Sequence, residues 1–222
     1  KKNGDWWYVC PRPQDSESLL IAVFNETHTL GKIYHPDLDC FKRSTLHSLT
    51  SFPTDQIVLA RTLTHFQAFY IHAAGLIING NGLLFLGHSG SGKSTITRLL
   101  EESGEVLCDD RIIVRSLPEG VSIHGSWSHG DVPTVSPNGA PLKAIFFLEK
   151  ADENAVIPLG EKREVLCRLI LLVVRPLISP DWWDKIFPVL EKIVQTVPAY
   201  SLRFDRNEAV KDLLLKTFPA QS

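Results

Sequence analysis

Near the middle of the chain, the segment Gly87–Ser94 reads Gly-His-Ser-Gly-Ser-Gly-Lys-Ser and fits G-x-x-x-x-G-K-S at every fixed position. An apolar run ends at Leu86 just before it, and a helix-like stretch follows from Ser94 to about Glu102. Glycines let the backbone wrap around an anion with its N–H groups pointing inward, and the start of a helix adds positive potential. The pattern therefore predicts a strand, a phosphate-binding loop and a helix in direct succession, as found in α/β folds.

The side chains of this segment suit a nucleotide bound with magnesium. Lys93 would supply a positive charge to the outer phosphates, and the Ser94 hydroxyl would be a metal ligand. A chance match in a glycine-containing loop is the alternative, and the flanking strand and helix argue against it. We predict ATP and Mg²⁺ as cofactors, bound by Gly87, His88, Ser89, Gly90, Ser91, Gly92, Lys93, Ser94 and Thr95.

Two adjacent aspartates, Asp109 and Asp110, follow the next predicted strand, Glu105–Cys108. Beside a phosphate loop, one carboxylate can hold magnesium and the other can accept the proton of an attacking hydroxyl. We predict both as catalytic residues and Asp110 as a metal ligand with Ser94. Neighbouring side chains on a strand point to opposite faces, so the spacing leaves open which aspartate is the base. An acidic turn without catalytic function is the alternative.

The rest of the pattern predicts a small β-rich lobe over residues 1–52 and a larger domain over residues 53–222. A helix capped by Thr54 opens the larger domain, and a hairpin turns at Asn79–Gly82 between the strands Gly75–Ile78 and Leu83–Leu86. Strands are further predicted at Trp6–Cys10, Leu19–Phe24, Leu30–Tyr34, Ile112–Arg115, Val121–His124, Lys143–Leu148 and Tyr200–Phe204. Helices are further predicted at Lys162–Leu172, Trp182–Gln195 and Glu208–Thr217, the last capped by Asn207.

Composition argues against several other classes of protein. The net charge is -2 and there is no run of Lys and Arg, so we expect no nucleic-acid partner. No apolar stretch reaches the roughly 18 residues that a membrane-spanning helix needs, so we expect no membrane partner. The 4 cysteines are widely separated, which predicts neither a zinc site nor a disulfide framework and favours a cytoplasmic protein.

Four features together resemble the HPr kinase/phosphorylase-like proteins: His72-Ala73-Ala74-Gly75, the hairpin, the loop Gly87–Thr95, and Cys108-Asp109-Asp110-Arg111. The resemblance covers roughly residues 71–115, and bacterial phosphoenolpyruvate carboxykinases share the same general core. It implies an α/β fold with a P-loop core of this type and a small N-terminal β-rich lobe. It also implies that His72 is an active-site histidine near the transferred phosphate, whereas without the family a lone histidine is more often structural.

The chain departs from the regulatory enzymes of that family after the aspartates. The segment Ser122–Asp131 lacks their glycine-arginine signature, so HPr is not the expected substrate. The chain looks more like divergent members that phosphorylate a serine of lasso-peptide precursors. His124, His129 and Asp131 are predicted contacts to the acceptor or to phosphate, the alternative being a surface loop with Trp127 in the core.

These inferences predict an ATP-dependent kinase that phosphorylates a serine of a protein or peptide. The resemblance also implies self-association into a homo-oligomer. A small-molecule kinase on the same core is one alternative and would have a closed pocket, whereas a peptide kinase would have an open groove. The other alternative is a nucleotide-binding module that does not turn over ATP. Retention of Lys93, Ser94 and both aspartates argues against it.

Overall fold

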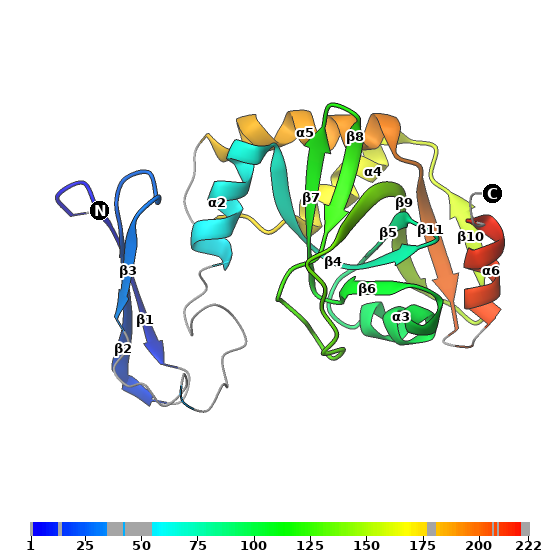
Figure 1. Cartoon of the computed structure of the whole chain (residues 1–222), viewed down its shortest axis with the longest axis horizontal. Helices are drawn as coiled ribbons and strands as arrows, with labels where there is room; N and C mark the ends of the chain where they lie inside the picture. Colours follow the sequence, from blue (N-terminus) through cyan, green and yellow to red (C-terminus); the bar gives the residue numbers. More distant parts are fainter. Residues whose placement is uncertain are drawn as a thin grey trace.

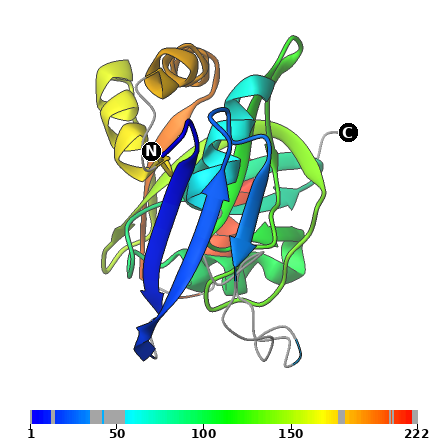
Figure 2. The same cartoon turned by 90° about the vertical axis from the view of Figure 1, so that its left-hand side faces the viewer.

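The computed structural model describes residues 2–12, 15–34, 42, 55–176, 181–205, 207 and 209–218. An antiparallel three-stranded sheet comes first in the chain and is formed by β1 (Trp6–Arg12), β2 (Asp15–Phe24) and β3 (Gly31–Tyr34) (Figures 1 and 2). The three strands predicted for this region are confirmed. The domain boundary at residue 52 falls outside the described residues and stays a prediction, as does the cap at Thr54.

One face of the small sheet is packed and the other is open. Tyr8, Ala22 and Phe24 lie on the packed face and contact Ile57, which belongs to the segment leading into the larger sheet. The phenol of Tyr8 is hydrogen-bonded to Nε2 of His28 at 2.7 Å. This alternation of buried and exposed positions is typical of an antiparallel sheet with one solvated face.

The larger sheet is mixed and has eight strands. Its order is β10-β11-β9-β5-β4-β7-β8, with β6 paired to β4. The long strand β9 runs parallel to β5 and β11, and its beginning also pairs with β8, so five of the strands close into a ring. The strands are β4 (Ala68–Ile78), β5 (Asn81–Leu86), β6 (Glu105–Cys108), β7 (Arg111–Leu117), β8 (Gly120–His124), β9 (Gly139–Lys150), β10 (Ala155–Pro158) and β11 (Ala199–Phe204).

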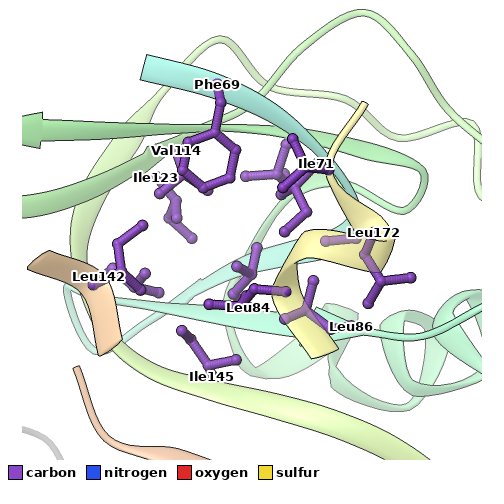
Figure 3. Packing of buried hydrophobic residues seen from close by; sticks show 14 of the residues in the cluster. Phe69, Ile71, Leu84, Leu86, Val114, Ile123, Leu142, Ile145 and Leu172 are labelled. Carbon is purple, nitrogen blue, oxygen red and sulfur yellow. The ribbon is translucent and has the colours of Figure 1, made fainter. Parts of the chain in front are cut away.

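Helices cover both faces of this sheet (Figure 1). On one face α4 (Lys162–Leu172) and α5 (Trp182–Thr196) pack against β4, β5, β7 and β9 (Figure 3). On the other face α3 (Lys93–Leu100) and α6 (Ala209–Thr217) pack against β4, β5, β9 and β11. Three short turns complete the helical segments: η1 (Asp55–Leu59, π-helical) and η2 (Leu63–Phe66, 3₁₀) flank α2 (Ala60–Thr62), and η3 (Glu101–Ser103, 3₁₀) extends α3.

Three local predictions need correction. The hairpin turn is shorter than expected, because Asn79 (φ 52°) and Gly80 (φ 75°) alone make the turn that a two-residue hairpin requires, while Asn81 and Gly82 belong to β5. The predicted helix after residue 53 is, in its described part, a π-turn, one α-helical turn and a 3₁₀ turn. Strand β10 was not predicted, because it pairs with β11, which is distant in the sequence.

Asn207 caps the last helix as predicted: its Oδ1 accepts a hydrogen bond from the N–H of Ala209 at 2.9 Å. Among the described residues, no helix is both long and apolar enough to cross a bilayer.

Candidate active site

The loop between β5 and α3 has the backbone shape that its glycines predict. Gly90 (φ 78°) and Gly92 (φ 108°) adopt conformations that other residues rarely reach, and a Cβ at Gly92 would lie 2.6 Å from the ring of Phe204. The helix α3 begins directly after it at Lys93. The sequence therefore folds into a tight loop whose amides precede a helix N-terminus, the arrangement that favours an anion.

Lys93 is buried beneath this loop. Its Nζ donates hydrogen bonds to the carbonyl oxygens of Gly87, at 2.9 Å, and His88, at 3.2 Å. Burial lowers the pKa of Lys93, while the negative charges of Asp110 and Asp109 oppose that shift. The ammonium group is thus held at the base of the loop, with two carboxylates near enough to influence it.

Asp109 is a structural anchor as well as a candidate site residue. Its carboxyl group belongs to a residue that is only 1% exposed. Oδ1 accepts a hydrogen bond from the N–H of Gly130 at 2.5 Å, and Oδ2 accepts one from the N–H of Val132 at 3.0 Å. Asp109 therefore fixes the loop that follows β8 against the end of β6.

Asp110 has a different environment from its neighbour. The hydroxyl of Ser128 donates to Oδ2 at 2.7 Å, Nε2 of His72 lies 3.3 Å from Oδ1, and Nε of Arg111 lies 3.4 Å from Oδ2. Burial raises the pKa of Asp110, but the hydrogen bonds from His72 and Ser128 and the charges of Arg111 and His72 outweigh it, and the pKa falls to about 2. Asp110 is therefore ionised at neutral pH.

Both carboxylates lie on the same cavity because Asp109 and Asp110 form a bend between β6 and β7 and are not part of either strand. The alternation of a strand, which would separate their side chains, does not apply there. The cavity has a volume of about 390 Å³. Its lining brings together residues from the loop, the bend and three other segments: His72, Ser89, Gly90, Gly92, Lys93, Ser94, Thr95, Asp109, Asp110, Gly130, Asp131 and Lys150.

Two of the predicted acceptor contacts do not line this cavity. The ring of His124 lies over Gly139, where β8 pairs with β9, and its Nε2 is hydrogen-bonded to Ser122 at 3.0 Å. Burial and the charge of Arg115 lower the pKa of His124. His129 is exposed and its Nδ1 lies 3.0 Å from the carbonyl oxygen of Gly130. Neither histidine is therefore among the residues that line the cavity with Asp110.

The remaining predicted residues differ in whether they line the cavity. Asp131 lines the cavity, and its carbonyl oxygen accepts a hydrogen bond from Arg98 at 3.1 Å. Within the loop, Gly87, His88 and Ser91 do not line this cavity. The Ser91 side chain lies over Gly87, and its buried hydroxyl has no hydrogen-bond partner in the described part of the chain. Trp127 is exposed, so the alternative that places its ring in the core is wrong.

The sequence did not point to three further residues near the candidate site, Lys150, Arg111 and Ser128. Lys150 ends β9, which runs parallel to β5, so the ends of both strands reach the same edge of the sheet. Ligand sites in α/β folds lie at such carboxyl ends, but a lysine just beyond the predicted strand Lys143–Leu148 becomes a signal only once the parallel pairing with β5 is known. The contact between Ser128 and Asp110 joins residues 18 positions apart and had no local signal.

The donor set fits magnesium bound together with phosphate groups. Among the described residues there is no cluster of three or more His, Cys, Asp and Glu side chains that would hold a metal by itself. Mg²⁺ commonly takes one or two carboxylates, a hydroxyl and the oxygens of a nucleotide. Ser94 and Asp110 supply such a hydroxyl and carboxylate in one cavity, beside Lys93 and residues of the loop that would hold the phosphates.

Comparison with known proteins assigns the chain to a family. The model of the family described as SynChlorMet cassette protein ScmC matches residues 44–169. This is more than half of the 222 residues, and the chain belongs to that family. Among curated proteins, none matches the chain significantly.

One solved structure with a related shape is that of the Hpr(Ser) kinase/phosphatase from Coxiella burnetii. It is 16% identical to this chain over an alignment that covers 67% of this chain and 92% of that one, with a TM-score of 0.38. A likeness of this size says nothing about activity.

Proposed function

We propose that this protein is a kinase that transfers the γ-phosphate of ATP to a serine hydroxyl of a peptide or protein. One observation carries the proposal: a phosphate-loop lysine and serine, Lys93 and Ser94, share a cavity with His72 and with both aspartates. Nucleotide-binding loops occur in many proteins, but carboxylates placed opposite the loop are what a hydroxyl acceptor needs.

In this proposal the loop and Lys93 bind the phosphates. Gly90 and Gly92 line the cavity just before α3, where their amides would meet the phosphates, and Lys93 supplies a charge at the base of the loop. Ser94 and Asp110 are the side chains that would hold Mg²⁺, with one carboxylate oxygen of Asp110 serving the metal and the other the acceptor. When bound, the metal neutralises charge on the phosphates. Lys150, at the end of β9, adds a second positive charge to the same cavity.

Asp110 is the aspartate that we assign to the acceptor. Both oxygens of Asp109 accept hydrogen bonds from backbone amides, which leaves Asp110 as the carboxylate with only side-chain partners. With a pKa of about 2, Asp110 is a weak base, so its main effect would be to orient the serine hydroxyl and accept its proton late. That role suits phosphoryl transfer, in which positioning and charge neutralisation carry most of the rate.

His72 would act as a positioning residue for Asp110. Its Nε2 lies 3.3 Å from Oδ1, and its strand is tied to the bend by a hydrogen bond from the N–H of Ala73 to the carbonyl oxygen of Asp110 at 2.9 Å. The imidazole thus fixes the direction of the carboxylate and adds positive charge when protonated.

The proposal is tested by incubating the protein with ATP, Mg²⁺ and serine-containing peptides, starting with peptides encoded in the same cassette. The expected product is phosphoserine, identified by mass spectrometry. We expect Asp110→Asn to lower kcat by at least about a hundredfold, a typical effect of removing a general base. Asp212→Asn, an exposed aspartate on α6, is the matched control and should not change the rate.

The other outcomes separate the alternatives. Phosphate on an added small hydroxyl compound but on no peptide would contradict the peptide acceptor and favour a small-molecule kinase. Tight ATP binding with no transfer to any acceptor would contradict the kinase and favour a nucleotide-binding module.

A further inference from the structure

A second cavity of about 630 Å³ adjoins the candidate active site. Its walls are the end of α4, the segment Val173–Pro176 that follows it, and the two tryptophans that begin α5. His72 and His88 complete the lining. His72 also lines the first cavity, and His88 belongs to the phosphate loop, so the second cavity opens next to the proposed point of transfer.

The wall formed by the segment after α4 is fixed to the large sheet. Val173 pairs with Ile71 of β4 as an isolated antiparallel bridge, and the N–H of Val174 donates to the carbonyl oxygen of Tyr70 at 2.7 Å. The same strand carries His72 one residue further on. The segment is therefore held in an extended conformation beside the strand that positions the site, which lowers the ordering cost of binding another extended chain.

The opposite wall is aromatic and partly open. Trp182 is buried, and its Nε1 donates to the carbonyl oxygen of Ala60 at 2.6 Å. The ring of Trp183 lies edge-on to it, with centroids 4.9 Å apart, and remains partly exposed. Leu171, at the end of α4, is 71% exposed although it lines the cavity. A partly exposed tryptophan and an exposed leucine make an apolar surface of the kind that anchors a peptide side chain.

We propose that this second cavity binds the acceptor peptide in an extended conformation, with an apolar or aromatic residue close to the acceptor serine seated against Leu171 and Trp183. The inference rests on the proposed kinase function. A cavity of this size suits several residues of a peptide, and because His72 lines both cavities, a peptide bound there would have its serine near Asp110. Arg175, exposed at the rim, favours an acidic residue beside the apolar one.

The test uses a synthetic peptide library with one fixed serine and each neighbouring position varied in turn. The wild-type protein should select Leu, Phe or Trp at one position near the serine. Leu171→Asp should raise KM for the preferred peptide about tenfold or more, since it replaces an apolar contact with a charge. Both kcat and the KM for ATP should stay within about twofold of the wild-type values. The substitution removes binding that the peptide makes equally in the ground state and the transition state, and it leaves transition-state stabilisation unchanged.

The matched control is Leu30→Asp, because Leu30 is 74% exposed, as open as Leu171, and does not line the cavity. Trp183→Ala against Trp7→Ala gives a second pair, since Trp7 is an exposed tryptophan of the small sheet. Thermal unfolding checks that each variant is folded. If Leu171→Asp does not fold, Leu171→Ser is the milder substitution that replaces it in the same test.

The outcomes distinguish this inference from the function on which it rests. Wild-type protein that phosphorylates peptides with no preference near the serine, or a Leu171→Asp variant with unchanged KM, would overturn the docking cavity and leave the kinase intact. Wild-type protein that phosphorylates no library peptide would contradict the peptide kinase itself, and with it the docking cavity.

Discussion

Asp109 and Asp110 are chemically identical neighbours, and their surroundings give them different roles. Asp109 is buried, with backbone amides on both oxygens, whereas the side chain of Asp110 is 24% exposed and is held by His72, Ser128 and Arg111. Hydrogen bonds from fixed amides stabilise a loop, while a carboxylate with side-chain partners can exchange one of them for a substrate. At the scale of the residue, Asp109 therefore anchors the loop after β8, and our proposal gives the role toward the acceptor to Asp110.

Asp109→Asn should destabilise the fold. An amide at this position can accept from only one of the N–H groups of Gly130 and Val132, and the other is left facing an NH₂ group. We expect a loss of about 2 kcal/mol in the free energy of unfolding, measured in urea at neutral pH. Asp131→Asn, at the exposed residue between the two contacted amides, is the control. Equal stability of both variants would mean that the carboxylate does not anchor the loop.

Asp110 should make stability depend on pH in the acid range. Its pKa is about 2 in the folded protein against 3.8 in the unfolded chain, so its contribution is fully present above pH 3.8 and is lost as pH falls through about 2. The shift corresponds to at most about 2 kcal/mol, because the side chain is partly exposed and solvent screens it.

Urea unfolding between about pH 5 and pH 2 measures this contribution. The stability advantage of the wild-type protein over Asp110→Asn should shrink by about 2 kcal/mol across that range. A constant difference, as we expect for the exposed Asp212→Asn, would show that the pKa of Asp110 is not depressed.

At the scale of the element, the junction between loop and helix depends on one backbone conformation. Gly92 precedes α3 at φ 108°, and its missing side chain leaves room for the ring of Phe204 on β11. Gly92→Ala should therefore both strain the backbone, by about 1–3 kcal/mol, and displace the ring or the loop.

We expect Gly92→Ala to weaken ATP binding at least about tenfold, measured by calorimetry with Mg²⁺. Gly160→Ala is the control, since a Cβ there would contact nothing and the backbone is not in the left-handed region. Unchanged ATP affinity in Gly92→Ala would contradict the assignment of this loop to phosphate binding.

The elements that could be predicted well from the sequence are those with local signals. The loop Gly87–Ser94, helix α3 and strand β6 lie close together in the sequence, and glycine placement and apolar periodicity were enough to locate them. Elements that depend on distant partners were missed or misjudged, as with β10, which pairs with β11, and the ring of His124, which β9 covers. The same reason applies to Lys150 and Ser128, because only the folded sheet brings them to Asp110 and the loop.

At the scale of the whole molecule, the closure of the sheet builds the candidate site. Strand β9 pairs with β5 and β11 at one end and with β8 at the other (Figure 1). This pairing brings the loop Gly87–Ser94, the bend after β6 and the loop after β8 around one cavity. Helix α5 and the end of α4 lie on the face where the second cavity opens. The three-stranded sheet stands apart and contacts the rest through Ile57 and its neighbours.

The central claim is that phosphate passes from ATP to an acceptor and not to water, and a single-turnover measurement with γ-labelled ATP tests it most directly. The protein is mixed with labelled ATP, Mg²⁺ and the best peptide from the library, and label is followed in peptide and in free phosphate. We predict that the label enters the peptide. Without peptide, free phosphate should form far more slowly than labelled peptide forms when the peptide is present. Label released only as free phosphate, at the same rate with and without peptide, would show an ATPase and contradict the account.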